Sequence, residues 1–466
     1  MNKRTRVGRA TLAAGFATVL VASLNVAPAY AATGAPTLAP RNASDPHVDY
    51  CSVTEGGVDK LYICVYTSSD LGRGGQNLYP MKDTYVYTLD TAVGSDASTW
   101  LNPGNPTSWV DRSVNTGPAF KEWQIPWALA NSPNPPANPE HLWAPTSHHG
   151  PIGPPDGTSQ AAATKQYLYV PDVGTEVVSG VSGDGRVSHI AVASVDKNMP
   201  WGPFTYEGRI TYKGDALNNL YMSDPAIVTT SFNHPGQARN GETSDYLQSR
   251  AGGPATWLLW ANGDWNNGGS GCGDLSIGLL NDVSMTELID NPDESVSRIQ
   301  INGIDALGTC SGANHPYIEG PELYDLTQVG LPLPGCDAIG QNCHRYMLFF
   351  SAKPAGSENQ VLAYATASNI YGPYTYRDKI MAGTNTSWTN HGSIYADTRG
   401  VVHNTNNPFG IRFLLFFHDD TGGTDHHRKM YAQCLTYSLE ERRFLTATRP
   451  PGPQAPNLNQ CSGTTA

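Results

Sequence analysis

The chain has 466 residues and a formal net charge of -12, and only 15% of its residues are charged. A chain this acidic repels nucleic-acid phosphates, which argues against a nucleic-acid partner. Its 48 glycines, 35 prolines and 23 tyrosines indicate many strands and turns and few surface helices.

The first residues have the pattern of a secretory leader. Four basic residues among the first nine precede an apolar stretch at 10–26, and Ala29-Tyr30-Ala31 has the small-x-small form of a cleavage site. Gly, Ser and Asn interrupt the stretch, which is shorter than the ~20 residues that a membrane span needs. We therefore predict a signal peptide at 1–31 and a secreted, extracellular protein at 32–466 that is not held in a membrane.

Short runs rich in Val, Ile, Tyr, Phe or Leu recur along the rest of the chain, separated by clusters of Gly, Pro, Asn and Asp. This is the signature of strands. The runs lie at 60–67, 166–170, 187–195, 257–261, 275–280, 345–351, 360–365 and 412–418. Helical periodicity is scarce, and we expect a turn or two of helix at 284–289.

The predicted strands fall into five blocks, near 45–115, 141–213, 221–290, 315–380 and 388–445. Blocks of roughly 60 to 75 residues suit four-stranded propeller blades with long insertions. Gly202-Pro203-Phe204 and Gly372-Pro373-Tyr374 would lie at comparable ends of two blades. A β-sandwich has the same strand statistics, so the spacing alone leaves both folds open. We expect one catalytic domain with a short C-terminal tail and no appended binding module.

All eight cysteines follow the predicted leader. An even number of cysteines in an exported chain indicates disulfides, and no C-x-x-C pair suggests a zinc or redox site. Proximity in the sequence is the only guide to pairing. It gives Cys51 with Cys64, Cys272 with Cys310, Cys336 with Cys343 and Cys434 with Cys461.

Three acidic residues each lie beside Pro or Gly at the start of an apolar run: Asp45, Asp224 and Glu319. The innermost strand of a propeller blade begins beside the central axis, so acids at such positions would converge. Glycoside hydrolysis needs one carboxylic acid and one carboxylate, and a third carboxylate near the acid raises its pKa. An Asp before Pro is also a common turn former, so these strings alone leave a structural role open.

Five motifs, taken in chain order, resemble those of family 43 glycoside hydrolases. They are Ser44-Asp45-Pro46-His47-Val48 followed by 61–70, then Leu142-Trp143-Ala144-Pro145, then 223–228, 318–324 and 389–394. The resemblance implies an all-β, five-bladed β-propeller that acts with inversion. It also implies that Asp45 is the general base, Asp224 the modulator of the acid's pKa, and Glu319 the general acid.

Glu322 is the rival to Glu319 as the acid. Along a regular strand, residues three apart point to opposite faces, so only one of the pair is expected to face a pocket. The Glu-Gly-Pro order favours Glu319.

Further residues are candidates for substrate binding. Trp143 and Trp388 can supply an apolar floor for a sugar ring. Arg428 lies in a stretch that resembles the xylosidase and arabinofuranosidase branch of the family, with Arg412 and Arg442 as alternatives. His391 resembles the axial histidine of the family.

The chemistry requires no cofactor, but the resemblance allows a structural calcium ion near His391. Calcium prefers oxygen ligands, so this histidine would contribute only part of such a site. The pairs at 148–149 and 426–427 lack the spacing of a known metal motif, which favours surface or pocket-rim roles.

We therefore expect a monomeric, secreted, inverting glycosidase that binds a polysaccharide or oligosaccharide substrate. The expected products are α-L-arabinofuranosyl or β-D-xylosyl units from arabinan, arabinoxylan or xylan. An endo-arabinanase of the same fold and a non-catalytic carbohydrate-binding propeller are the alternatives. The polar segments 231–250 and 262–274 depart from the family pattern and leave the choice of sugar and of exo or endo action open.

Overall fold

The structure is a computed structural model. It describes residues 43–70, 81–90, 109–133, 141–149, 164–177, 186–216, 221–231, 254–262, 275–281, 284–289, 298–308, 317–336, 343–357, 359–384, 390–397, 411–419, 428–447 and 464–465. The chain divides into a unit at Met1–Gly34 and a unit at Ala35–Ala466, and all described residues belong to the second. The predicted signal peptide lies outside the described residues.

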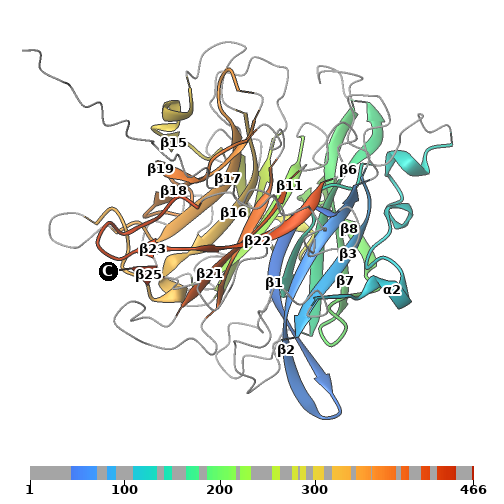
Figure 1. Ribbon diagram of the computed structural model, residues 1–466. Helices are drawn as coiled ribbons and strands as arrows, with labels where there is room; N and C mark the ends of the chain where they lie inside the picture. The colour runs from blue at the N-terminus through green and yellow to red at the C-terminus, as the bar shows by residue number, and fades with distance from the viewer. Residues whose placement is uncertain are drawn as a thin grey trace, which may run out of the picture. The chain divides into compact units, whose positions relative to one another are not determined.

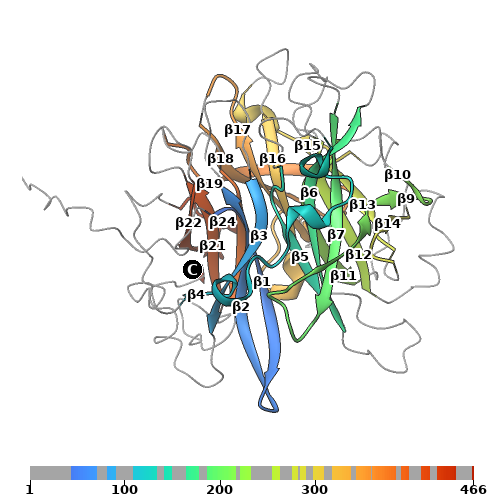
Figure 2. The same ribbon diagram turned by 90° about the vertical axis from the view of Figure 1, so that its right-hand side faces the viewer.

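Five sheets, each built from consecutive strands, form a five-bladed β-propeller (Figures 1 and 2). Blade 1 contains β1 (Ala43–Glu55), β2 (Val58–Asp70), β3 (Met81–Asp90) and β4 (Trp109–Asp111). Blade 2 contains β5 (Thr146–His149), β6 (Lys165–Val177), β7 (Arg186–Asp196) and β8 (Thr205–Arg209). Blade 3 contains β11 (Ser223–Ser231), β12 (Pro254–Ala261) and β13 (Leu275–Leu279).

Blade 4 contains β16 (Tyr317–Asp325), β17 (Tyr346–Lys353), β18 (Val361–Ala367) and β19 (Tyr374–Met381), with β15 (Ile301–Asn302) pairing in parallel at its outer edge. Blade 5 contains β20 (Gly392–Asp397), β21 (Arg412–Asp419) and β22 (Lys429–Leu435). The five predicted blocks correspond to the five blades, and all eight predicted runs are strands. The fold class is therefore confirmed, and the sandwich is excluded.

Smaller elements decorate the blades. One short sheet contains β9 (Thr211–Tyr212), β10 (Asp215–Ala216) and β14 (Glu287–Leu288), and another contains β23 (Tyr437–Ser438), β24 (Arg443–Phe444) and β25 (Thr464–Thr465). The described helices are α2 (Ser113–Thr116), η2 (Glu122–Gln124), η3 (Leu129–Asn131), η5 (Ile304–Leu307) and η7 (Leu326–Val329). None of these described helices is long and apolar enough to cross a membrane.

The helix predicted at 284–289 is wrong. This segment contains β14, which pairs in parallel with β9, while Leu288 also forms a bridge to Leu280. Leu288 is buried and packs with residues of blades 2 and 3. Tertiary pairing with the blade edge thus decides the conformation of a segment whose local pattern was ambiguous.

Each interface between neighbouring blades holds one hydrophobic cluster, and five clusters close the ring. Strand β12 shows why its run is apolar throughout. Trp257 and Leu259 pack toward blade 4, while Leu258 and Trp260 pack toward blade 2. Since successive side chains of a strand point to opposite faces, a strand buried on both faces needs a continuous apolar run instead of an alternating one.

Blade 5 packs against blade 1 and closes the propeller. In Figure 1, β22 and β21 lie beside β1, and the backbone N–H of Ala43 donates to the carbonyl of Arg428 at 3.1 Å. Val48 of β1 shares a cluster with Leu414 and Phe416 of β21. The closure brings residues from the two ends of the propeller into one site.

Two of the predicted disulfides are confirmed. Cys51–Cys64 joins β1 to β2, and Cys336–Cys343 closes a short loop after η7. Cys434 is disulfide-bonded to a partner outside the described residues, and the predicted Cys272–Cys310 bond also lies outside them. The two Gly-Pro strings lie immediately before the outer strands β8 and β19, as the sequence predicts.

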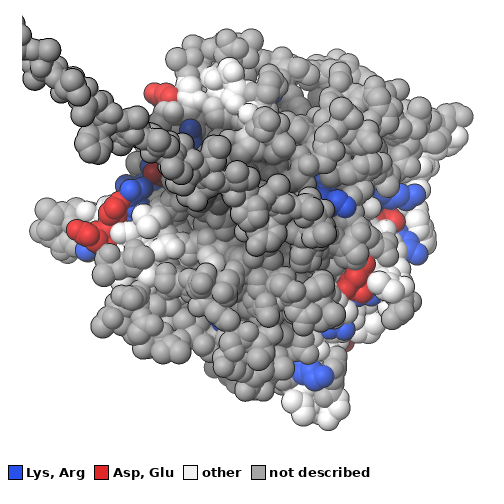
Figure 3. All heavy atoms as spheres, in the orientation of Figure 1, with Lys and Arg blue, Asp and Glu red and all other residues white. Residues whose placement is uncertain are grey.

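The described surface charges are mixed. In Figure 3, acidic and basic side chains lie near one another along the margins of the visible face. Exposed ion pairs of this kind join Arg443 to Asp378 and to Glu441, and Lys165 to Glu207. Exposed pairs such as these contribute little to stability, typically about 0–1 kcal/mol.

Candidate active site

Three inner strands begin with the same backbone irregularity, and each carries one of the predicted acids. The ladder of β1 shifts between Ser44 and His47, that of β11 between Ser223 and Ala226, and that of β16 between Glu319 and Glu322. A proline follows the irregular residue each time, and because proline has no N–H, the break in the ladder leaves no unpaired donor there.

The residue before each proline has a positive φ: 50° at Asp45, 47° at Asp224 and 56° at Gly320. Aspartate adopts this left-handed conformation more readily than most residues, and glycine does so freely. Asp45, Asp224 and Gly320 therefore occupy equivalent positions, and Glu319 lies one residue earlier in its blade.

The ring of His391 explains this difference in blade 4. A Cβ added to Gly320 would meet three atoms of that ring at 3.0–3.1 Å, so a side chain there would require the ring to move. The acid of blade 4 comes instead from the preceding residue, and glutamate has one methylene more with which to reach the site.

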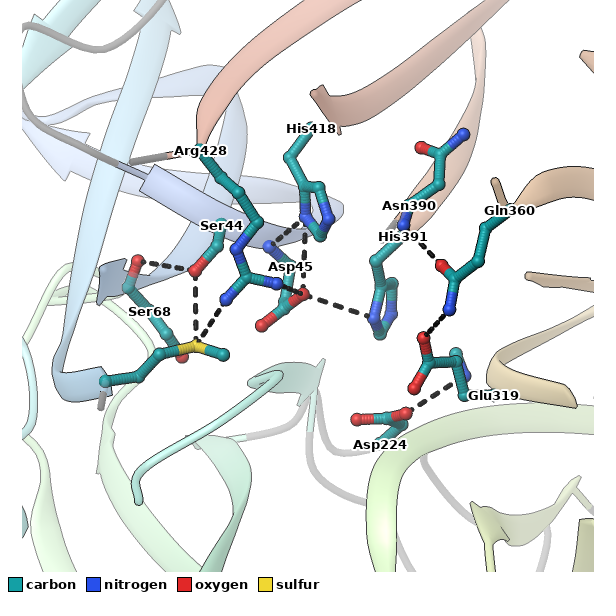
Figure 4. A network of polar contacts seen from close by, with 12 residues as sticks. Ser44, Asp45, Ser68, Asp224, Glu319, Gln360, Asn390, His391, His418 and Arg428 are labelled. Atoms are coloured by element: carbon teal, nitrogen blue, oxygen red, sulfur yellow. Dashed lines mark hydrogen bonds and ion pairs between the residues drawn. The ribbon is translucent and has the colours of Figure 1, made fainter. Parts of the chain in front are cut away.

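Asp45 is held by groups from blade 5 (Figure 4). Its Oδ1 lies 3.2 Å from a guanidinium nitrogen of Arg428, 3.3 Å from Nδ1 of His418 and 3.6 Å from Nδ1 of His391. The backbone N–H of Asp45 donates to Nδ1 of His418 at 2.8 Å. Asp45 is buried, so its carboxylate has a cationic partner and a fixed orientation.

Arg428 is positioned by a second contact. Its guanidinium lies 3.1 Å from the sulfur of Met81, and the hydroxyl of Ser44 lies 3.3 Å from the same sulfur. The predicted contact of Arg428 with a carboxylate is therefore present. Of the two alternatives, Arg412 is buried at the start of β21 and Arg442 is exposed in the turn before β24.

Asp224 and Glu319 lie together across from Asp45 in Figure 4. The backbone N–H of Gly320 donates to Oδ2 of Asp224 at 3.1 Å, and Nε2 of Gln360 donates to Oε1 of Glu319. Burial, followed by the negative charges of Glu319 and Asp45, raises the pKa of Asp224 well above its usual value. The charges of the three carboxyl groups therefore interact. The pair of Asp224 and Glu319 keeps one proton up to a higher pH than two isolated acids would.

The prediction that Glu319 and Glu322 point to opposite faces of the strand is wrong, so it does not support the preference for Glu319. Glu319 lies opposite Ser351 and Glu322 lies opposite Phe349, because the irregularity inserts an extra residue into β16. Ser351 and Phe349 are two apart on β17 and share a face, so alternation does not separate the two glutamates.

Their contacts do separate the two glutamates. Glu322 is buried and its Oε1 lies 2.7 Å from Nδ1 of His47, whereas Glu319 is partly exposed beside Asp224. Glu322 therefore already has a partner in blade 1.

The pair of His47 and Glu322 links blade 1 to blade 4 and makes stability depend on pH. Burial lowers the pKa of His47, but the charge and hydrogen bond of Glu322 outweigh this, and the net pKa lies above the usual 6.5. A raised pKa means that the stabilisation is complete below pH 6.5 and is lost as pH rises through the folded-state pKa. We expect Glu322→Gln to cost about 1–3 kcal/mol at low pH and to flatten this dependence. Thermal unfolding between about pH 5 and pH 9 tests this, and an unchanged slope in the variant would refute it.

We expect the ionised carboxylate of Asp224 to destabilise the folded protein. Because its folded-state pKa is raised, the folded protein binds this proton more tightly than the unfolded chain, so stability falls as pH rises above 3.8. Asp224→Asn removes the ionisation and keeps an acceptor for the N–H of Gly320. At neutral pH we expect its Tm to rise on the order of 1–3 °C while turnover falls about tenfold or more. A variant that loses both stability and turnover would contradict this account.

The remaining predicted residues have varied outcomes. Trp143 packs edge-on against His141, with ring centroids 5.6 Å apart, and its role as a sugar platform stays a prediction. Trp388 and the histidine pair at 426–427 lie outside the described residues. His148 contacts Thr229, and His149 stacks on a tyrosine of β1.

The possible calcium ion near His391 also stays a prediction. Within the described ranges, no group of three or more His, Cys, Asp or Glu side chains is arranged to hold a metal ion. Burial lowers the pKa of His391 despite the opposing charges of Asp45 and Glu322, so the ring is neutral near pH 7.

Two contributors were not predicted from the sequence. His418 directly follows the apolar run of β21 and is fully buried, and a histidine at that position is the signal that marks it. Gln360 precedes β18 in the same way. In both cases the partner lies far away in the sequence, so local pattern does not reveal it.

Solved structures of family 43 glycoside hydrolases share this fold. A GH43 β-xylosidase/α-arabinofuranosidase from a compost microbial metagenome, in complex with xylotriose and calcium-free, is 20% identical with a TM-score of 0.51 over 89% of this chain and 96% of that one. A GH43_1 enzyme from Xanthomonas citri complexed with xylose is 19% identical with a TM-score of 0.51 over 91% and 95%. At these identities the similarity concerns the fold. No protein-family model matches the sequence, and no curated protein does.

Proposed function

We propose that this chain, which has the propeller fold of family 43 glycoside hydrolases, is an inverting glycoside hydrolase. The observation that supports the proposal most is the convergence of Asp45, Asp224 and Glu319 at three equivalent strand starts. A non-catalytic sugar-binding propeller would have no need of an aspartate whose pKa is raised by burial and by two other carboxylates. Such costly groups concentrate at functional sites.

In the proposed mechanism, each carboxyl group has one role. Asp45 accepts a proton from a water molecule, which attacks the anomeric carbon. Glu319 gives its proton to the departing glycosidic oxygen. Because attack and departure occur on opposite sides of the sugar in one displacement, the configuration inverts.

Two neighbours support these roles. Asp224 is buried near Glu319, and the repulsion between their negative charges disfavours ionisation of both, so the pair keeps a proton that Glu319 can deliver. Arg428 orients the carboxylate of Asp45 by donating to its Oδ1, and His418 fixes the backbone of Asp45 by accepting its N–H. Arginine donates several hydrogen bonds in a fixed plane, so we propose that Arg428 also donates to a sugar hydroxyl.

We further propose that the substrate carries α-L-arabinofuranosyl or β-D-xylosyl units. Solved structures of the same fold were determined with xylotriose and with xylose. The disulfides within blade 1 and after η7 fit an oxidising, extracellular setting, as the proposed secretion requires. Plant cell-wall arabinan, arabinoxylan and xylan contain both sugars.

The direct test is a panel of aryl α-L-arabinofuranosides, aryl β-D-xylosides and the three polysaccharides. The proposal predicts that the purified chain hydrolyses at least one aryl pentoside and that the double variant Asp45→Asn/Glu319→Gln does not. The double variant controls for a contaminating hydrolase. Equal activity of both proteins, or no activity of the wild-type chain on any member, would overturn the proposal.

A further inference from the structure

Gln360 bridges the proposed acid and the next blade. The residue is 4% exposed and lies immediately before β18. Its amide oxygen accepts a hydrogen bond from the backbone N–H of Asn390, and its amide nitrogen donates to Oε1 of Glu319 (Figure 4). Because a backbone N–H can only donate, the amide oxygen must face Asn390 and the NH2 group must face Glu319.

This orientation distinguishes the two oxygens of Glu319. In a neutral carboxylic acid the carbonyl oxygen is the better acceptor, and the hydroxyl oxygen carries the proton. A donor fixed against Oε1 therefore favours protonation on Oε2. The bond also favours the ionised form of Glu319 after it has given its proton away.

The same bridge connects the acid to the base. Asn390 directly precedes His391, whose Nδ1 lies 3.6 Å from Oδ1 of Asp45. A continuous set of contacts thus runs from Glu319 through Gln360 to blade 5 and on to Asp45. In an inverting glycosidase the spacing between acid and base must leave room for a water molecule. A rigid connection between the two residues would maintain that spacing.

We infer that Gln360 is a positioning residue for the general acid, which selects Oε2 of Glu319 as the proton-bearing oxygen and holds the acid at its distance from Asp45. This inference rests on the proposed function. Its structural alternative is a polar link that merely stabilises the contact between blades 4 and 5.

Leaving-group dependence distinguishes the two roles. A dinitrophenyl pentoside departs without protonation, whereas an unactivated phenyl or alkyl pentoside needs the acid. We expect Gln360→Met to lower kcat about 10- to 100-fold on the unactivated substrate and less than about threefold on the activated one. Losing the donor also raises the pKa of Glu319, so the basic limb of the pH profile of kcat/KM moves to higher pH.

Two further variants make the test decisive. Gln166→Met removes another buried amide, one that donates to the hydroxyl of Tyr66 at 2.6 Å in the interface between blades 1 and 2. We expect it to lower Tm and to leave the ratio of the two rates unchanged. Gln360→Glu keeps an acceptor for Asn390 if the methionine variant does not fold. Its added negative charge must move the basic limb to higher pH.

An equal loss on both substrates in Gln360→Met, or an unmoved basic limb in Gln360→Glu, would overturn the positioning role alone. The wild-type enzyme and Glu319→Gln are run beside these variants. If the wild-type chain cleaves neither pentoside, or if Glu319→Gln shows no dependence on the leaving group, the proposed function fails and this inference fails with it.

Discussion

Replacing Glu319 with glutamine is expected to lower kcat about 10²–10⁴-fold on an unactivated pentoside and far less on a dinitrophenyl pentoside. Glutamine keeps the size of the side chain and can still accept the bond from Gln360, but it has no acidic proton. General-acid catalysis is therefore lost only for substrates whose leaving group needs protonation. The basic limb of the wild-type pH profile should also vanish in the variant. Steady-state rates on both substrates across pH measure these effects.

Glu322→Gln is the matched control, because it removes a carboxyl group three residues further along β16. Glu322 pairs with His47 in blade 1. We expect this variant to be less stable at low pH and to keep its turnover within a few-fold at temperatures where it stays folded. If Glu322→Gln lost the leaving-group-dependent activity and Glu319→Gln kept it, the assignment of the acid would be reversed.

Asp45→Asn is expected to lower kcat about 10²–10⁴-fold on activated and unactivated pentosides alike. Attack by water needs the base whatever the leaving group, which separates this variant from Glu319→Gln. Asparagine also tolerates a positive φ, here 50°, and keeps a polar partner for Arg428, so the local fold should survive.

Asp49→Asn is the control on the same strand. Asp49 accepts a hydrogen bond from the N–H of Tyr50 at 2.7 Å and contacts Ser147, away from Arg428 and His418. We expect it to retain wild-type rates. Near-normal hydrolysis by Asp45→Asn, measured with enzyme free of wild-type contamination, would remove Asp45 from the mechanism.

Most of the fold was predictable because each blade is buried on both faces. That burial demands continuous apolar runs such as 257–261, and such runs separated by Gly and Pro are visible in a single sequence. The choice between propeller and sandwich was not visible in the same way, because both architectures require such strands. The segment 284–289 was misjudged because its conformation depends on pairing with β9 and with Leu280.

The acids could be found from the sequence because a local rule marks them. At the start of these inner strands, the residue before proline has a positive φ, and the sequence there is Asp-Pro or Gly-Pro. Their neighbours could not be found in this way. His418 meets Asp45 across 373 positions, and this contact exists only once blade 5 has closed on blade 1. Gln360 meets Glu319 across 41 positions, and this contact exists only once the strands of blade 4 have paired.

The difference between Glu319 and Glu322 shows a further limit. A two-residue period is valid only along a regular strand, and the inserted residue in β16 cancels it. Glu319 remains the candidate because it lies beside Asp224 and Gln360. Its position in the strand alternation relative to Glu322 does not support the choice.

The stereochemistry of the first product tests the central proposal most directly. A proton-NMR time course on an aryl pentoside that the enzyme cleaves follows the anomeric signals before mutarotation mixes them. With Asp45 activating water and Glu319 acting as the acid in a single displacement, the first signal should be that of the inverted anomer. Initial release of the retained anomer would mean that a covalent intermediate forms, and it would contradict the roles proposed for these two carboxylates.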